Sequence, residues 1–330
     1  MVKIDVYSLL LTDDKCYVLL EKEYFLRIRE RVILQYGSLK NFSKSILKIP
    51  YGRAKWFFKP ESHKQVMLFE KTLISINQPM PSSYPFIKSF YHYGSRNTGT
   101  TIPKEIVIDE QFVEGFSLYL GDGTTGTHGL LPSKKFRFTN ADIDVIKFFL
   151  DWLRRYFPSF SYVVRISIPQ GLKVSEGFIS NLASYLQINS DVLRFSTGYY
   201  NKQIKYRVVV DNILLIKLFL IMKKTVHKEV LKNKKLMSAY IRGMSAAEGT
   251  AYFRPPHKYV RIEMKDKKEI CFMSRLLDKL SVDHLLMSRS NRSGMCSIHI
   301  GKRTDLQLFS KKIGFGCSKK REKVLKKICF

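Results

Sequence analysis

Cysteine is scarce in this sequence. The 330 residues include 5 cysteines, which form no CxxC pair and no Cys/His spacing of the kind that holds zinc. An odd number also argues against the disulfide framework of a secreted domain. We therefore expect reduced, structural cysteines and no zinc site.

Long hydrophobic runs are also missing. The longest, residues 213–222, is interrupted by Lys217 and is far shorter than the ~20 residues that a transmembrane helix needs. Near the N-terminus, Asp5, Asp13 and Asp14 leave too little room for the apolar segment of a secretory signal. We expect a soluble intracellular protein, cytoplasmic or nucleoid-associated, with an organelle as the open alternative and no membrane partner.

The chain is strongly basic and has enough apolar side chains to fold. Its 45% hydrophobic and 13% aromatic content excludes a disordered chain, and its length predicts about two domains. Lys and Arg number 57 against 28 Asp and Glu, a net charge of +29, which predicts a polyanionic partner because phosphates release counterions on binding. The basic residues follow strand-like alternation, which favours nucleic acid over a membrane surface.

Two stretches share one helical pattern. Residues 112–124 and 237–250 each place two small residues four positions apart and then continue with an acid, Gly and Thr. Small residues at this spacing let two helix backbones approach closely, so we expect these helices to pack against each other. The expected helix-interface residues are Ser117, Gly121, Gly243 and Ala247.

The similarity continues downstream. Residues 137–139 match 261–263 at an offset of 124, and residues 208–210 match 298–300 at an offset of 90. The first copy thus holds 34 extra residues, expected between about 154 and 200. Periods of 2 and 3.6 predict that each copy consists of a helix, two strands, a helix, two strands and a helix.

An acid ends each of the two matched helices. Asp122 and Glu248 each precede a glycine suited to a left-handed helix end, where the macrodipole disfavours a carboxylate by ~0.3–1 kcal/mol. A single such acid is ordinarily a solvated helix end, but two in register indicate a functional site. Two carboxylates that lie close together either raise a pKa or require a cation. Hard oxygen ligands, including the carbonyls of Gly121 and Ala247, suit Mg²⁺.

These motifs resemble those of a known family. Residues 115–123 and 241–249 are similar to the two signature motifs of double-motif LAGLIDADG homing endonucleases, and Ile102-Pro103 and 313–315 add support. Ser117 stands where the first motif usually has Gly, which a small side chain allows. The resemblance covers about residues 103–330.

The resemblance implies an α+β fold with two pseudo-symmetric αββαββα halves, 103–225 and 226–330. Their antiparallel sheets would form a saddle over the DNA major groove, with Mg²⁺ at Asp122 and Glu248. It further implies a monomeric, site-specific double-strand DNA endonuclease that hydrolyses phosphodiesters at a long target site. Lys302 matches the family's basic residue near the scissile phosphate. The first-half equivalent is Asp211-Asn212, so the two strands are expected to be cut unequally.

Sequence readout is expected on the sheet face opposite the helices. If Phe138, Val208 and Ile262 face the core, period 2 turns their neighbours toward DNA. Each of these side chains alone could equally be solvated, and the prediction rests on the set. Its members are Arg137, Thr139, Lys205, Arg207, Arg261, Glu263 and His299, extended in hairpins by Arg194, Lys202, Arg289 and Arg292.

Residues 1–100 stand outside the repeat. Helices are expected over 23–35, 38–47 and 51–58, with Gly37 after the first. They resemble a helix-turn-helix DNA reader, although an ordinary basic helical cluster explains the same residues. Residues 78–101, rich in Pro, Ser, Gly and Thr, are expected to be a linker. The candidate contacts are Arg53, Lys55 and Lys59.

Other functions fit parts of the sequence. A LAGLIDADG-fold protein that binds without cutting, either an intron RNA maturase or a transcriptional regulator, would be favoured by loss of the motif acids, and both acids are present. A basic structural RNA-binding protein predicts no metal dependence. Serine or cysteine nucleophiles lack a supporting His/Asp constellation, and residues 121–126 lack the GK[ST] ending of a P-loop.

Overall fold

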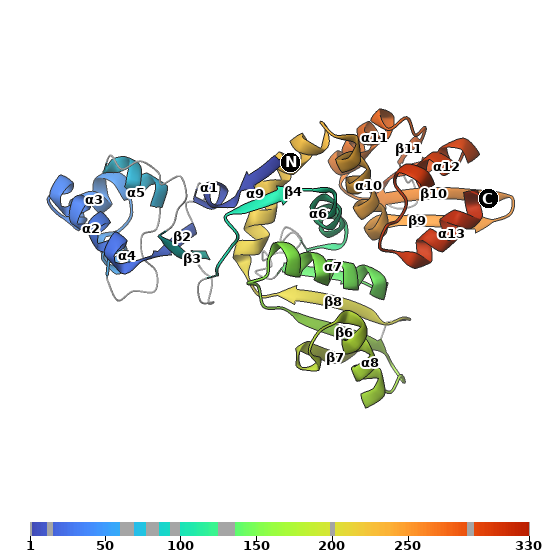
Figure 1. The fold of residues 1–330 in the computed structure, drawn as a ribbon, viewed down its shortest axis with the longest axis horizontal. Coiled ribbons are helices and arrows are strands. Elements are labelled where there is room, and N and C mark those ends of the chain that lie inside the picture. The colour runs from blue at the N-terminus through green and yellow to red at the C-terminus, as the bar shows by residue number, and fades with distance from the viewer. Residues whose placement is uncertain are drawn as a thin grey trace. The chain divides into compact units, whose positions relative to one another are not determined.

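The expected α+β class is confirmed by the structure, a computed structural model (Figure 1). It describes residues 2–11, 16–59, 69–76, 86–92, 100–124, 136–198, 202–288 and 294–329. Every helix within these ranges is too short or too polar to cross a bilayer.

The chain divides into two compact units. The repeat unit consists of residues 1–2, 107–211 and 223–330, and the N-terminal unit consists of residues 3–106 and 212–222. The predicted halves 103–225 and 226–330 therefore fall almost entirely within the repeat unit. The boundary between those halves stays a prediction.

The N-terminal unit contains helices that lie close to their predicted bounds. The helix α2 ends at Gly37, whose φ of 71° suits glycine, and the side chain of Ser38 accepts a hydrogen bond from the backbone of Asn41 to begin α3. The elements here are β1 (Val2–Asp5, of which Val2 belongs to the repeat unit), α1 (Val6–Leu11), β2 (Cys16–Leu20), α2 (Lys22–Tyr36), α3 (Leu39–Phe42), a π-helical turn (Ser43–Leu47), α4 (Tyr51–Phe57), α5 (Phe69–Ser75), β3 (Ile87–His92) and β4 (Glu105–Ile108, of which 107–108 belong to the repeat unit).

Part of the expected linker is a strand. Within residues 78–101, the strand β3 pairs antiparallel with β2 and places Phe90 opposite Val18. Both of these side chains are buried. Ile87, Ser89 and Tyr91 alternate along β3, but this pattern indicates a strand only when a partner strand is known to cover it. Composition alone therefore suggested a linker.

The repeat unit contains the remaining elements. They are α6 (Glu110–Asp122), β5 (Phe136–Asn140), α7 (Ile143–Tyr156), β6 (Val163–Pro169), α8 (Glu176–Leu186), a 3₁₀ turn (Ser190–Val192), β7 (Leu193–Gly198), β8 (Lys205–Val210), α9 (Ile213–Val230, of which 213–222 belong to the other unit), α10 (Lys234–Glu248), β9 (Gly249–Arg254), β10 (His257–Met264), α11 (Lys267–Lys279), β11 (Leu285–Ser288), β12 (Cys296–Ile300), α12 (Arg303–Lys312) and α13 (Lys319–Cys329).

The repeat unit contains two four-stranded sheets whose strand pairs have equivalent registers. Their strand orders are β5-β8-β6-β7 and β11-β12-β10-β9. Phe138 lies opposite Val208 in the first sheet, and Ile262 lies opposite Ile298 in the second, which are the positions that the two sequence offsets equate. The single bridge from Gly123 to Phe138 likewise matches the pairing of Gly249 with Ile262.

The extra residues of the first copy form a helix and a strand. The strand β6 pairs antiparallel with β8 as β11 does with β12, and α8 then leads to β7, which pairs parallel with β6. This parallel pair is a correction to the expected all-antiparallel sheet, and it needs the crossover that α8 supplies. The first copy therefore departs from the simple helix and strand order predicted for it.

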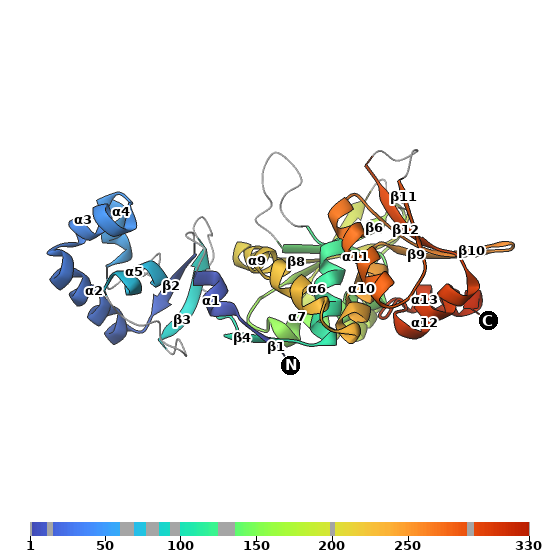
Figure 2. The same ribbon diagram turned by 90° about the horizontal axis from the view of Figure 1, so that it is seen from above.

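Each sheet buries one face beneath helices. Residues Phe138 and Val208 are buried in the first sheet, and Ile262 and Ile298 in the second. The helix α11 packs on β10 and β12, and α7 packs on β5 and β8. The helices α6 and α10 lie side by side (Figures 1 and 2). Their crossing positions the candidate site.

Candidate functional site

The helices α6 and α10 touch through the small residues that the sequence marks. A Cβ atom added at Gly243 would lie 2.2 Å from Ser117 Oγ, and one added at Gly121 would lie 2.5 Å from the Cβ of Ala247. Both distances are shorter than any normal contact, so the two backbones are as close as glycine permits. The C-terminal ends of both helices therefore lie together.

The glycines that follow the two acids serve a different purpose from the one predicted. Gly123 and Gly249 have φ values of −87° and −88°, so neither is left-handed. Each begins an extended segment, and a Cβ would lie 2.3 Å from the Tyr119 carbonyl oxygen at Gly123 and 2.4 Å from that of Ser245 at Gly249. Glycine is needed at both positions because a side chain would overlap the last turn of the preceding helix.

Asp122 and Glu248 form an acid pair at these helix ends, and both side chains are partly exposed. Burial raises the pKa of Asp122 to about 7, and the charge of Glu248 contributes. Asn140 Nδ2 donates to Asp122 Oδ2 at 2.5 Å and opposes this shift. Burial also raises the pKa of Glu248, with a further contribution from the charge of Glu263.

Arg321 on α13 is a residue at the site that the sequence did not indicate. Its charge lowers the pKa of both Asp122 and Glu248, against the larger effect of burial. Its guanidinium donates to the carbonyl of Ala246, and more weakly, at 3.4 Å, to that of Ala247. The predicted ligand carbonyl of Ala247 therefore already has a donor. Arg321 lies 73 residues after Glu248, so local sequence patterns could not have found it.

Lys302, the third predicted catalytic residue, has another partner here. It lies beyond the end of β12 as the residue before α12, and its exposed ammonium group forms an ion pair with Asp283. The charge that acts on both acids is that of Arg321. The structure thus does not associate Lys302 with the acid pair.

The acid pair offers hard oxygen ligands for a divalent cation. Within the described ranges, no three or more His, Cys, Asp or Glu side chains gather closely enough to hold a metal ion. Two carboxylates nevertheless fit Mg²⁺, which commonly takes one or two from the protein and fills its remaining positions with water and phosphate oxygen. The mutual charge of the pair, which raises the pKa of Asp122, is what such an ion would relieve.

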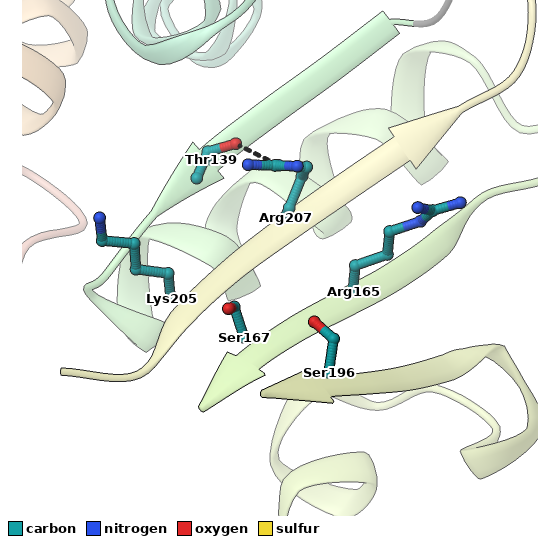
Figure 3. A pocket seen from close by; sticks show the side chains of 6 residues that line it. All are labelled: Thr139, Arg165, Ser167, Ser196, Lys205 and Arg207. Atoms are coloured by element: carbon teal, nitrogen blue, oxygen red, sulfur yellow. Dashed lines mark hydrogen bonds between the residues drawn. The ribbon is translucent and has the colours of Figure 1, made fainter. Parts of the chain in front are cut away.

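The open face of the first sheet is a basic hollow (Figure 3). Arg207 Nε donates to Thr139 Oγ1 at 3.1 Å, and three of the six lining residues were predicted DNA contacts. Arg165, Ser167 and Ser196 were missed, although the alternation of 163–169 would have indicated the first two. The lining residues are Thr139, Arg165, Ser167, Ser196, Lys205 and Arg207.

The other predicted contacts of the first sheet lie around this hollow. Arg137 is partly exposed two residues before Thr139, and Lys202 is exposed in the turn before β8. Arg194 pairs with Arg165 across the β6–β7 ladder. Its guanidinium donates to the backbone carbonyls of Asp191 and Leu193.

The open face of the second sheet carries aromatic rings. The Tyr259 ring lies 4.9 Å from the rings of both Tyr252 and His299, and the guanidinium of Arg261 lies 5.1 Å from its centroid. Arg261 is also 3.4 Å from Glu263. The two tyrosines were not predicted. The predicted contacts Arg289 and Arg292 lie outside the described residues.

The helix α4 of the N-terminal unit exposes aromatic and basic side chains together. Trp56 is 57% exposed and Tyr51 is 43% exposed, while Lys55 is exposed and Arg53 is partly exposed. Lys59, two residues after the end of α4, is also exposed. Exposed aromatics beside cations are typical of surfaces that contact nucleic acid. The helix-turn-helix reading remains a prediction.

No family model and no curated protein matches this sequence. Among solved structures, I-DmoI in complex with DNA and Mn is 17% identical over 63% of this chain and 98% of its own, with a TM-score of 0.39. The N-terminal LAGLIDADG domain of DUF199/WhiA is 12% identical over 64% and 84%, with a TM-score of 0.38. Full-length DUF199/WhiA from Thermotoga maritima is 11% identical over 68% and 61%, with a TM-score of 0.41.

The helix contact can be tested with two glycine substitutions. Gly243→Ala should lower the free energy of unfolding by about 1–3 kcal/mol, because the new Cβ would overlap the Glu114 carbonyl. Gly177→Ala in α8, where the nearest atom is 4.0 Å away, should instead stabilise by about 0.4–1 kcal/mol. Urea denaturation measures both, and equal stability of the two variants would contradict the contact.

The acid pair predicts a pH dependence of the metal-free protein. The raised pKa keeps the proton on Asp122 in the folded state up to about pH 7, whereas the ordinary pKa of aspartate, which applies in the unfolded chain, is 3.8. The free energy of unfolding should therefore fall as pH rises through this window and level off above it. Asp122→Asn should remove this loss, on the order of 1–2 kcal/mol at pH 8. In Glu248→Gln, carboxyl NMR should show Asp122 titrating at lower pH, and an unmoved titration would contradict the coupling.

Proposed function

We propose that this chain is a metal-dependent, site-specific double-strand DNA endonuclease of the LAGLIDADG type. The observation that supports it most directly is the acid pair, in which two helices deliver one partly exposed carboxylate each from backbones that are in contact. Burial and like charge make this arrangement costly without a cation. A protein that only bound DNA through its sheets would not need two carboxylates at this position.

The two sheets support a duplex-binding surface. Their matched registers fit two pseudo-symmetric halves, and each sheet leaves one face open with Arg side chains at its centre, namely Arg207 and Arg261. We place the duplex across both open faces, in the saddle that the family resemblance implies. Phosphates would meet the first-sheet hollow, while the aromatic row of the second would contact base edges or sugars.

In this mechanism Asp122 and Glu248 would hold Mg²⁺ or another divalent cation, with help from the carbonyls of Gly121 and Ala247. A bound divalent ion supplies polarisation of the phosphoryl oxygen and a lower pKa for bound water. Asn140 holds one oxygen of Asp122 in place at 2.5 Å. Arg321 fixes the C-terminal end of α10 through its carbonyls and offsets part of the negative charge.

The residue that faces the scissile phosphate is open to two assignments. Lys302 stays the candidate that the family resemblance implies, and its exposed ion pair with Asp283 would have to exchange for phosphate. Arg321 is the cation that acts on the acids themselves. A single cation serving two acids would make cleavage of the two strands unequal.

One observation favours a LAGLIDADG-fold protein that binds nucleic acid without cutting it, either a transcriptional regulator or an intron RNA maturase. Arg321 already donates to the carbonyls of Ala246 and Ala247, where a metal ion would otherwise find ligands. A guanidinium there provides part of the neutralisation that a cation would supply. This second function needs no divalent ion.

Cleavage by the acid pair can be tested directly. A randomised duplex library incubated with the protein and Mg²⁺, followed by sequencing of cut ends, should give one long target site. Asp122→Asn and Glu248→Gln should each abolish cutting of that site while keeping duplex affinity, because both acids act on the metal. Asp151→Asn, which removes a partly exposed acid paired with Arg154 on α7, should cut normally.

Undiminished cutting by both motif variants would refute the assignment of the acids. Specific duplex binding by the wild type with no cutting in Mg²⁺ or Mn²⁺ would favour the regulator. Gel-shift measurements in Ca²⁺ supply the binding data without turnover.

Phosphate contact in the first-sheet hollow predicts a change in salt dependence. Arg165→Gln and Arg207→Gln should each weaken duplex binding roughly eightfold at 0.1 M salt and flatten the log–log salt slope by about 0.9, the value expected for one lost phosphate contact. Lys326→Gln on α13, an exposed position, is the matched control. Slopes identical to the wild type would remove these arginines from the interface.

A further inference from the structure

A second basic hollow lies between α9 and α11, and none of its residues belongs to the acid pair or to an open sheet face. Its volume is about 650 Å³. Because α11 covers the buried side of β10 and β12, the hollow opens on the side of the sheet opposite Arg261 and His299. Its lining residues are Lys223, His227, Lys267, Lys268, Glu269, Cys271, Phe272 and Arg275.

The one acid of this hollow is fully engaged. Glu269 is 2% exposed and accepts from Lys223 Nζ at 2.7 Å and from the buried hydroxyl of Tyr240. In the part of the chain that the structure describes, no acid pairs with Lys267, Lys268 or Arg275. Three cations around the rim therefore remain available to an anionic ligand.

Two of these cations stand where a helix disfavours them. Lys267 and Lys268 open the first turn of α11, where the macrodipole is positive and a cation is disfavoured by about 0.3–1 kcal/mol. Together with Arg275, eight residues after Lys267, they form a line of positive charge about 12 Å long along the helix. This length accommodates more than one phosphate of a strand.

An aromatic pair lies among the cations. The Phe272 ring stacks on His227, with centroids 4.1 Å apart and an interplanar angle of 13°, and both residues are partly exposed. Burial lowers the pKa of His227, which favours the neutral form of its ring. Cations that follow phosphates beside aromatic rings that stack bases are the combination that binds unpaired strands. A duplex offers no free base face to such rings.

We propose that the hollow between α9 and α11 binds a single-stranded nucleic-acid segment. Lys267, Lys268 and Arg275 contact its phosphates, and the His227–Phe272 pair stacks against one base. The site is separate from the duplex surface, so it stands whether or not the chain cuts DNA.

The test measures binding of dye-labelled 12-nucleotide RNA and DNA strands to the full chain by fluorescence anisotropy. The double variant Lys267→Glu with Lys268→Glu is compared with Lys326→Glu with Lys327→Glu, which changes the net charge equally at exposed positions of α13. The first should weaken strand binding roughly 25-fold at 0.1 M salt and flatten the salt slope by about 1.4, as two lost phosphate contacts require. The second should have a much smaller effect. The RNA and DNA arms show which sugar is preferred.

Two further measurements keep the result independent of folding and of cleavage. Phe272→Leu, which keeps an apolar side chain, should weaken binding at least about fivefold through lost stacking. A saturating strand should protect Cys271, which lines the hollow, from alkylation relative to Cys296. Equal weakening by both charge-reversal variants, or unchanged alkylation of Cys271, would overturn the proposal. Duplex cleavage should be unchanged in the Lys267→Glu, Lys268→Glu variant. The hollow and the acid pair are then tested separately, and loss of cutting in the acid variants is due to the acid pair alone.

Discussion

The contact between α6 and α10 is the constraint on which the rest of the site depends. At Gly243 and Gly121 there is no room for a Cβ atom, so the helices approach until their backbones meet. Both helices run in the direction that brings their C-terminal ends together. Two negative helix ends and two carboxylates therefore lie together, and Arg321 is a positive charge that acts on both acids.

The two acids occupy equivalent positions but different surroundings. The first sheet supplies Asn140, whose amide donates to Asp122 and lowers its pKa. The second supplies Glu263, whose charge raises the pKa of Glu248. The sequence offset of 124 equates Thr139 with Glu263. The two copies therefore differ at this position beside the site, which is neutral in the first copy and acidic in the second. The pKa values of the two carboxylates are therefore raised against different surroundings.

The sheets diverge in the same way. In the first, Arg165, Lys205 and Arg207 line a hollow with hydroxyl side chains, a surface suited to phosphate. In the second, the open face is built from Tyr252, Tyr259 and His299 with Arg261 above a ring. Duplex bound across both faces would meet unlike chemistry on its two sides, which suits an asymmetric target rather than a palindrome.

The features that could be predicted from the sequence are those that periodicity and internal repetition encode. The offset of 124 equates Phe138 with Ile262, and the offset of 90 equates Val208 with Ile298. Each sheet pairs the two residues of its own copy, so the offsets anticipated the strand register. Sequence reasoning missed Arg321 and placed a linker over β3, because those features depend on contacts with chain segments far away in sequence. Lys302 was assigned from the family resemblance, by its place at the end of the last strand. The exposed Asp283 that pairs with it belongs to no local sequence pattern.

The helix α13, which lies outside the repeated pattern, completes the site. Its first turn is tied to the start of α7 by Ser318, whose hydroxyl donates to Asp142 at 2.6 Å. One turn later, Arg321 reaches the carbonyls at the end of α10. A helix anchored to the first copy thus carries the cation that holds the acid-bearing helix of the second. In the proposed metal-binding role, a divalent ion would oppose the same negative charge as this guanidinium, so the two cations would compete for the acid pair.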